Sequence, residues 1–133
     1  MKRAAFLLVC LLGLANFQLS FANNHQDSAD ALQAHTFATP EETWNHFKSA
    51  IMDGDFETAF KCCCPDESRS VLKFEKMAPE KRKTIIESMG PIQKIVQQDK
   101  AAKYRLPRNS NGATFYTYVY FEKENAAWKI AGF

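Results

Sequence analysis

The spacing of the hydrophobic residues changes once along the chain, near residue 91. Before that point apolar side chains recur every three or four residues, as on one face of a helix; after it they alternate with polar ones, as in a strand. The first pattern predicts helices that begin at Pro40, Phe56, Pro65 and Pro79. The second predicts strands at 92–98, 101–106, 113–122 and 127–133. This order indicates an α+β fold, with N-terminal helices packed on a curved antiparallel sheet of about four strands.

Several helix boundaries carry strong local signals. Thr39 can cap the first helix, Glu42 completes a capping box, and Pro40 suits the first helical position. Gly54 ends this helix and Asp55 caps the next one. On the third helical stretch, the residues expected to face the core are Val71, Leu72, Phe74 and Met77.

The segment 113–122 is the clearest strand, because its residues alternate strictly. Its inward residues are expected to be Phe115, Thr117, Val119 and Phe121. The opposite face then carries our candidate interface or ligand residues, Tyr116, Tyr118 and Tyr120. Tyrosine is enriched at interfaces, but a tolerated half-wet surface and a small-molecule platform remain alternatives. Pro107 is expected to end the preceding strand, and turns are expected at 109–112 and 123–125.

The first 22 residues have the layout of a secretory signal peptide. Lys2 and Arg3 precede an apolar run over 4–15, and Ser20 and Ala22 are the small residues before a cut. The run is shorter than the ~20 residues that span a bilayer. We therefore expect an exported protein, periplasmic or secreted, that leaves the membrane after cleavage; an uncleaved anchor and lipidation of Cys10 are the alternatives.

The predicted signal peptide also defines where we expect the domain boundaries. After the signal peptide, 1–22, we expect a flexible lead, 23–37, and a single α+β roll domain, 38–133. His25 and His35 fall in the lead, where they have no partners that converge on them. A mature chain of this length can bury one hydrophobic core.

Charge argues against nucleic acid as a partner. The chain has 17 Lys and Arg and 15 Asp and Glu, but two of the basic residues lie in the leader, so the mature chain is neutral. Acids gather in 41–57 and bases in 94–108; the bases are Lys94, Lys100, Lys103, Arg105 and Arg108. The two runs either complement each other, within one fold or across a dimer, or the basic run is a docking surface.

Three cysteines remain after cleavage: Cys62, Cys63 and Cys64. They are candidate thiol residues with three interpretations: small apolar residues at a helix end, an intermolecular or vicinal disulfide, or metal or redox chemistry. Adjacent thiols lack the C-x-x-C spacing that lets two thiolates converge on one ion. We therefore expect no metal and no other cofactor.

A family resemblance enters with three segments. Thr39-Pro40-Glu41-Glu42 with Trp44 and Phe47, then 53–60, then Trp128-Lys129-Ile130, together resemble the nuclear transport factor 2-like superfamily, a cystatin-like α+β roll. The chain looks like small exported bacterial members of unknown function. The resemblance implies a cone between helices and sheet, where the enzymes of the superfamily keep an acid or a His-Asp pair. His46 lies on the opposite flank of the first helix from Trp44, and no catalytic residue can be assigned here.

The sequence therefore predicts an exported, non-catalytic binding or protein-interaction module. Its partner is expected to be a second copy that pairs through the sheet face, another protein, or a small hydrophobic ligand. The alternatives are a small enzyme of the isomerase, cyclase or dehydratase type acting in the cone, and a thiol-dependent role of Cys62–Cys64.

Export should remove residues 1–22. Because Ser20 and Ala22 occupy the −3 and −1 positions, intact-mass measurement of protein recovered from the exported fraction should give a chain that begins at Asn23. A mature species that keeps Lys2 and Arg3 would contradict this assignment.

Overall fold

The computed structural model describes residues 37–133, so the predicted signal peptide and most of the lead lie outside the described part. Within that part the helices are α2 (Pro40–Asp53), α3 (Phe56–Lys61), the 3-10 helix η1 (Pro65–Glu67), α4 (Ser68–Glu75) and α5 (Pro79–Glu87). The strands are β1 (Gln93–Gln97), β2 (Ala101–Ser110), β3 (Ala113–Glu124) and β4 (Ala127–Gly132). The predicted α+β class is confirmed. None of the helices in 37–133 is long and apolar enough to cross a membrane.

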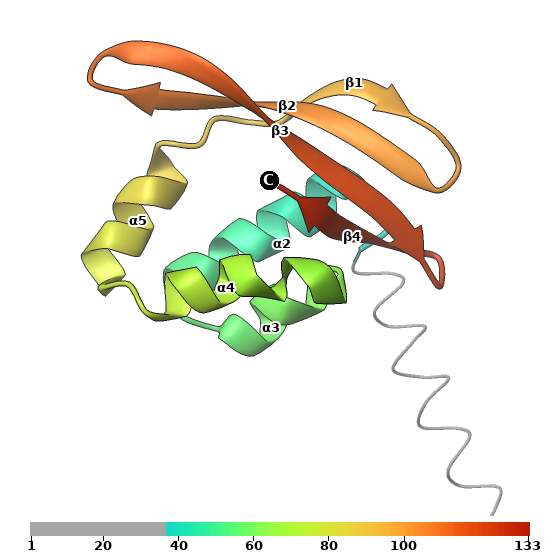
Figure 1. Cartoon of the computed structure of the whole chain (residues 1–133), viewed down its shortest axis with the longest axis horizontal. Coiled ribbons are helices and arrows are strands. Elements are labelled where there is room, and N and C mark those ends of the chain that lie inside the picture. Colours follow the sequence, from blue (N-terminus) through green and yellow to red (C-terminus); the bar gives the residue numbers. More distant parts are fainter. Residues whose placement is uncertain (1–36) are drawn as a thin grey trace, which may run out of the picture. The chain divides into compact units, whose positions relative to one another are not determined.

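The strands form one open antiparallel sheet in the order β1-β2-β3-β4. Figure 1 shows the helices gathered on one side of this twisted sheet. The β4 edge is covered, because Cys63 forms a parallel bridge with Ile130. The Ile130 N–H donates to the Cys62 carbonyl at 2.8 Å, and the Cys64 N–H donates to the Ile130 carbonyl at 2.8 Å. Among the described strands, β1 therefore has the uncovered edge.

Helix α2 begins and ends as its sequence predicts. The Thr39 hydroxyl accepts from the Glu42 N–H, and the Glu42 carboxylate accepts from the Thr39 N–H, which completes the capping box. At the other end Gly54 adopts φ 75°, a left-handed conformation that suits glycine. Both ends of the helix are therefore fixed by local interactions, which sets the position of its buried residues along the sheet.

Aromatic rings fill the space between α2, α4 and the C-terminus. Trp44 and Phe47 are both fully buried, and their ring centroids lie 5.5 Å apart. Phe133 packs edge-on against Phe47 at 5.2 Å and stacks on Phe74 at 6.5 Å. Such pairs add to the stability that area burial already provides. The interior at this place is therefore packed with apolar side chains.

A buried hydroxyl ties α2 to β4. The Thr43 Oγ1 lies 3.0 Å from the Trp128 carbonyl and 3.0 Å from the Thr39 carbonyl. The Trp128 N–H donates to the Phe37 carbonyl at 2.9 Å. Phe37, which the sequence places at the end of the lead, is only 4% exposed and belongs to the core.

Strand β2 is longer than predicted. Pro107 does not end it, because β2 continues to Ser110 and Pro107 pairs with Tyr116 of β3. The Pro107 carbonyl accepts from the Gly90 N–H at 2.9 Å, so its ring nitrogen also faces away from β3. The pairing with β1 has already ended at Arg105, and the missing N–H therefore costs no ladder hydrogen bond.

The turns and two apolar residues also differ from expectation. The hairpin turns lie at Asn111–Gly112 and Asn125–Ala126, all with positive φ, whereas the second was expected at 123–125. Phe115 was expected to face the helices, but it is 46% exposed, and the Arg108 guanidinium lies 6.0 Å from its ring. Leu72 is 42% exposed, because the buried stripe of α4 is narrow and contains only Val71 and Phe74.

Trp44→Ala should lower the free energy of unfolding by ~3–5 kcal/mol, because it removes a fully buried ring from the aromatic cluster. Leu72→Ala is the matched control: its side chain is 42% exposed, and the loss should stay below ~1 kcal/mol. Urea titration of both variants measures the difference. Equal losses for the two would contradict the packing described here.

Candidate functional site

The three candidate tyrosines lie on the face of the sheet opposite the helices. Tyr116 is 52% exposed, Tyr118 is 44% and Tyr120 is 45%, whereas Val119 and Phe121 between and beside them are buried. The period of a strand explains the difference, since successive side chains point to opposite faces. The structure thus brings the three rings together on one open surface.

Two cations from the neighbouring strand β2 pack on these rings. Lys103 Nζ lies 4.2 Å from the ring centroid of Tyr118 and 5.4 Å from that of Tyr120. The Arg105 guanidinium carbon lies 4.7 Å from the centroid of Tyr116. A cation above the face of an aromatic ring is attracted by the ring's quadrupole. Each of the three tyrosines therefore has one ring face covered by a cation.

The Arg105 guanidinium is also fixed from the other side. Its Nε and Nη2 donate to Gln93 Oε1 of β1 at 3.0 and 2.6 Å. The tyrosines and the two cations form one continuous surface, the aromatic–basic face, which comprises Tyr116, Tyr118, Tyr120, Lys103 and Arg105.

The sequence indicated the tyrosines and the basic run separately. The alternation in β2, in which Ala102, Tyr104 and Leu106 are buried, places Lys103 and Arg105 on the opposite face. This alternation is the sequence signal that could have shown that the two cations and the tyrosines share one face.

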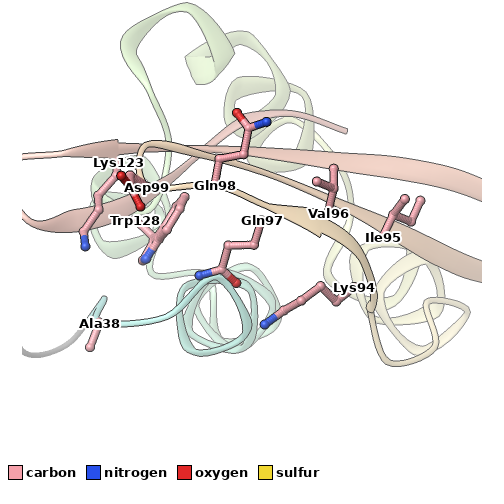
Figure 2. A pocket seen from close by; sticks show the side chains of 9 residues that line it. All are labelled: Ala38, Lys94, Ile95, Val96, Gln97, Gln98, Asp99, Lys123 and Trp128. Carbon is pink, nitrogen blue, oxygen red and sulfur yellow. The ribbon is translucent and has the colours of Figure 1, made fainter.

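The aromatic–basic face continues onto β1. Val96 pairs with Lys103 and is 46% exposed, and Ile95 beside it is 51% exposed. The register of β1 shifts between Lys94 and Val96. Figure 2 shows Ile95 and Val96 on the side of β1 opposite Lys94 and Gln97. The bulge thus adds apolar surface beside the two cations.

A broad groove of about 740 Å³ runs along β1, and Ile95 and Val96 contribute to its lining. Figure 2 shows Lys94 and Gln97 pointing into this region toward α2, with Trp128 and Lys123 at its far end. Lys123 Nζ lies 5.6 Å from the Trp128 ring. Trp128 is only 3% exposed, so the groove offers little aromatic surface to a ligand.

The polar groups beside this groove have structural partners. The Tyr104 hydroxyl donates to Glu41 Oε1 at 2.7 Å, and Lys94 Nζ lies 3.9 Å from the same oxygen. Burial and the Glu41 carboxylate raise the pKa of Tyr104, so the phenol keeps its proton. The contact joins α2 to the sheet, and it pairs one member of the acidic run with one member of the basic run within the fold.

The three cysteines lie where the chain leaves α3 and pairs with β4. Cys62 is fully buried, Cys63 and Cys64 are each 7% exposed, and all three thiols are free. Burial raises the pKa of Cys62 and of Cys64 to about 12, and it also raises the pKa of Cys63. The thiolate is the reactive form of cysteine, so the thiols are held in their unreactive form. This placement favours the interpretation as small apolar residues.

A cysteine and two carboxylates approach one another beside this segment, which the sequence did not reveal. Ligand atoms of Cys64, Glu122 and Glu124 lie within 4.8 Å of one another. Lys129 Nζ donates to the Lys61 carbonyl next to them, and burial lowers the pKa of Lys129. A lysine beside the carboxylates already supplies positive charge, so the group resembles a structural charge cluster.

His46 is exposed, as its position on the flank of α2 predicts. Its ring makes an edge contact with Phe37, with 5.8 Å between centroids. The aromatic cluster around Trp44 occupies the interior beneath the sheet. The His46 side chain lies on the surface and does not reach this interior.

No model of a known protein family matches the chain, and no curated protein matches it. The resemblance to the nuclear transport factor 2-like superfamily therefore stays a prediction. The function is inferred from the geometry of the described residues.

Folding stability should fall between pH 9 and pH 12. Burial raises the pKa of Cys62 from 9.0 to about 12, so in this window the folded chain keeps a proton that the unfolded chain releases. For one such thiol the free energy of unfolding falls by about 1.4 kcal/mol per pH unit within the window. Lys129 and Asp55 also act on this thiol, and the lowered pKa of Lys129 contributes with the opposite sign.

Urea titrations at pH 8 and pH 10, of the wild type and of Cys62→Ala, isolate the thiol. The variant should lose less stability between the two pH values than the wild type, although its stability at pH 8 is lower. Identical losses would show that the Cys62 thiol is not the titrating group.

Proposed function

We propose that this chain is an exported, non-catalytic binding module that holds a protein partner on the aromatic–basic face. The observation that carries the proposal is the exposure of Tyr116, Tyr118 and Tyr120 in one row, each 44–52% accessible, with Val96 exposed next to Lys103 on the neighbouring strands. An exposed apolar patch of several large side chains is uncommon on a monomer and marks interaction surfaces. Tyrosine is among the residues that contribute most to such interfaces.

The face is ordered before any partner arrives. Lys103 and Arg105 pack against the rings, and Arg105 is also held by Gln93. Side chains that are already fixed lose less conformational entropy on binding, which leaves more of the contact energy as affinity. Because β2 and β3 pair over ten residues, the backbone below the face is rigid as well. These features support recognition by a preformed surface.

The packing of the interior supports a binding role over catalysis. In the place where an enzyme of this type would hold its substrate, Trp44, Phe47 and Phe133 are in ring-to-ring contact. A catalytic acid or base must lie within hydrogen-bond reach of a substrate proton. The exposed tyrosines, by contrast, are directly accessible. Export through the signal peptide, 1–22, remains part of this proposal and would bring the face to the periplasm or the exterior.

Amine-reactive cross-linking in the exported fraction tests the proposal, because Lys103 supplies a reactive amine in the centre of the face. In the wild type, cross-linked peptides identified by mass spectrometry should contain Lys103. The triple variant Tyr116→Thr/Tyr118→Thr/Tyr120→Thr keeps β-forming residues but removes the rings, and its yield of Lys103 cross-links should fall at least tenfold.

The matched control replaces exposed apolar residues elsewhere: Met52→Thr/Leu72→Thr, both 42% exposed on helices, should keep the wild-type yield. Circular dichroism verifies that each variant is folded. A wild type without Lys103 cross-links to any partner, or a triple variant with unchanged yield, would overturn the proposed function.

A further inference from the structure

Both cations of the aromatic–basic face lack a carboxylate partner among the residues that the structure describes. The ion pairs in this part of the chain join Lys61 to Glu57, Lys83 to Glu87 and Lys94 to Glu41, and neither Lys103 nor Arg105 takes part. The rings and the neutral amide of Gln93 hold them instead. Their charges are therefore available to an incoming group.

The acid nearest along β3 belongs to a different cluster. Glu122 lies two residues beyond Tyr120 on the same face, but its carboxylate approaches Cys64 and Glu124, and its register partner on β4 is Lys129. On β2 its partner is Ala101, not a cation. Among the residues that the structure describes, the centre of the face thus carries two positive charges and no negative one, and Glu122 at its end makes no ion pair with either cation.

We propose that the occupant of this face is an acidic protein segment, whose carboxylates bind Lys103 and Arg105 while its apolar atoms pack on the tyrosine rings and Val96. The inference rests on the proposed function of the face and names the chemistry of the partner. Arg105 uses two of its five N–H groups for Gln93, which leaves three for a carboxylate. Charge-assisted bonds of this kind are stronger than neutral ones and give the contact its direction.

The same charges disfavour a second copy as the occupant. In a two-fold symmetric dimer through this face, the aromatic–basic face of one copy would contact the same face of the other copy. Two Lys103 and two Arg105 side chains would then be brought together without an acid, and desolvated like charges weaken an interface. An acidic segment would instead be attracted to the face, because its carboxylates neutralise both cations while it covers the rings.

The geometry also disfavours a carbohydrate and a dense polyanion. A sugar stacks on the open face of an aromatic ring, and here one face of each tyrosine is covered by a cation. A phosphate polymer or a sulfated polysaccharide needs a long basic surface. The centre of this face has only two cations among the described residues, and the acidic side chain of Glu122 lies at its end, two residues beyond Tyr120.

Fluorescence anisotropy with a labelled acidic peptide, a 12-residue chain with three glutamates among leucine and serine residues, tests the inference on the full mature chain. The peptide should bind the wild type, its Gln counterpart should bind at least tenfold more weakly, and raising the salt from 50 to 300 mM should weaken the complex. Lys103→Gln/Arg105→Gln should raise the Kd at least tenfold. Lys103→Arg/Arg105→Lys keeps both charges and should stay within threefold of the wild type.

The control variant Lys73→Gln/Lys81→Gln removes two exposed charges from α4 and α5 and should leave the Kd unchanged. Heparin binding that exceeds binding of the acidic peptide, stacking of a neutral oligosaccharide, or a sedimentation mass of a dimer that the tyrosine variant converts to monomer would each overturn the inference.

The two proposals fail in different ways. If Lys103 forms cross-links to a partner that the tyrosine variant loses, whereas Lys103→Gln/Arg105→Gln binds the acidic peptide as the wild type does, the face is an interface and the acidic partner is wrong. If neither cross-links nor peptide binding involve the face, both proposals are wrong.

Discussion

The packing of α2 against the inner face of the sheet determines the rest of this structure. Trp44, Phe47 and Ile51 are fully buried, and they commit the facing residues of β2 and β3, such as Tyr104 and Phe121, to the interior. A strand has a period of two, so every residue between them must face the other way. The exposure of the tyrosines, and of the cations that pack on them, is thus a direct consequence of burial on the opposite side.

The second constraint is the parallel pairing between Cys62–Cys64 and β4. It covers an edge that would otherwise offer unpaired N–H and C=O groups, and it joins the helical half of the chain to its last strand. Small side chains suit this position, because the segment is buried where it pairs with β4. Burial keeps the pKa of these thiols high, and the cysteines act here as packing residues. The remaining edge, β1, carries a bulge that turns Ile95 and Val96 to the outer face, next to Lys103.

Local chemistry made much of the fold predictable. The capping box at Thr39 and the glycine at 54 act over a few residues and have the predicted outcome, whereas the alternation predicted for 113–122 holds from Thr117 to Phe121 and fails at Phe115. The errors concern partners distant in the sequence. Pro107 continues a strand because β1 has already ended beside it, and Phe115 is exposed because Arg108 rather than a helix lies against it. The sequence predicted the tyrosines of the aromatic–basic face but not the cations that pack on them. The register of β2 against β3 decides which basic residues contact the tyrosines, and this register depends on contacts distant in the sequence.

The cations on the aromatic–basic face have two effects that a row of bare tyrosines would lack. They cover ring faces that would otherwise be open to non-specific stacking, and they leave positive charge that no carboxylate within 37–133 compensates by an ion pair. The first effect reduces the tendency of an exposed apolar patch to associate with copies of itself, a tendency that a formal net charge of only +2 does little to oppose. The second makes an acidic partner the one that gains most from the contact. Selectivity then arises from the repulsion of like faces as much as from the attraction of the partner, which is how specific interfaces generally discriminate.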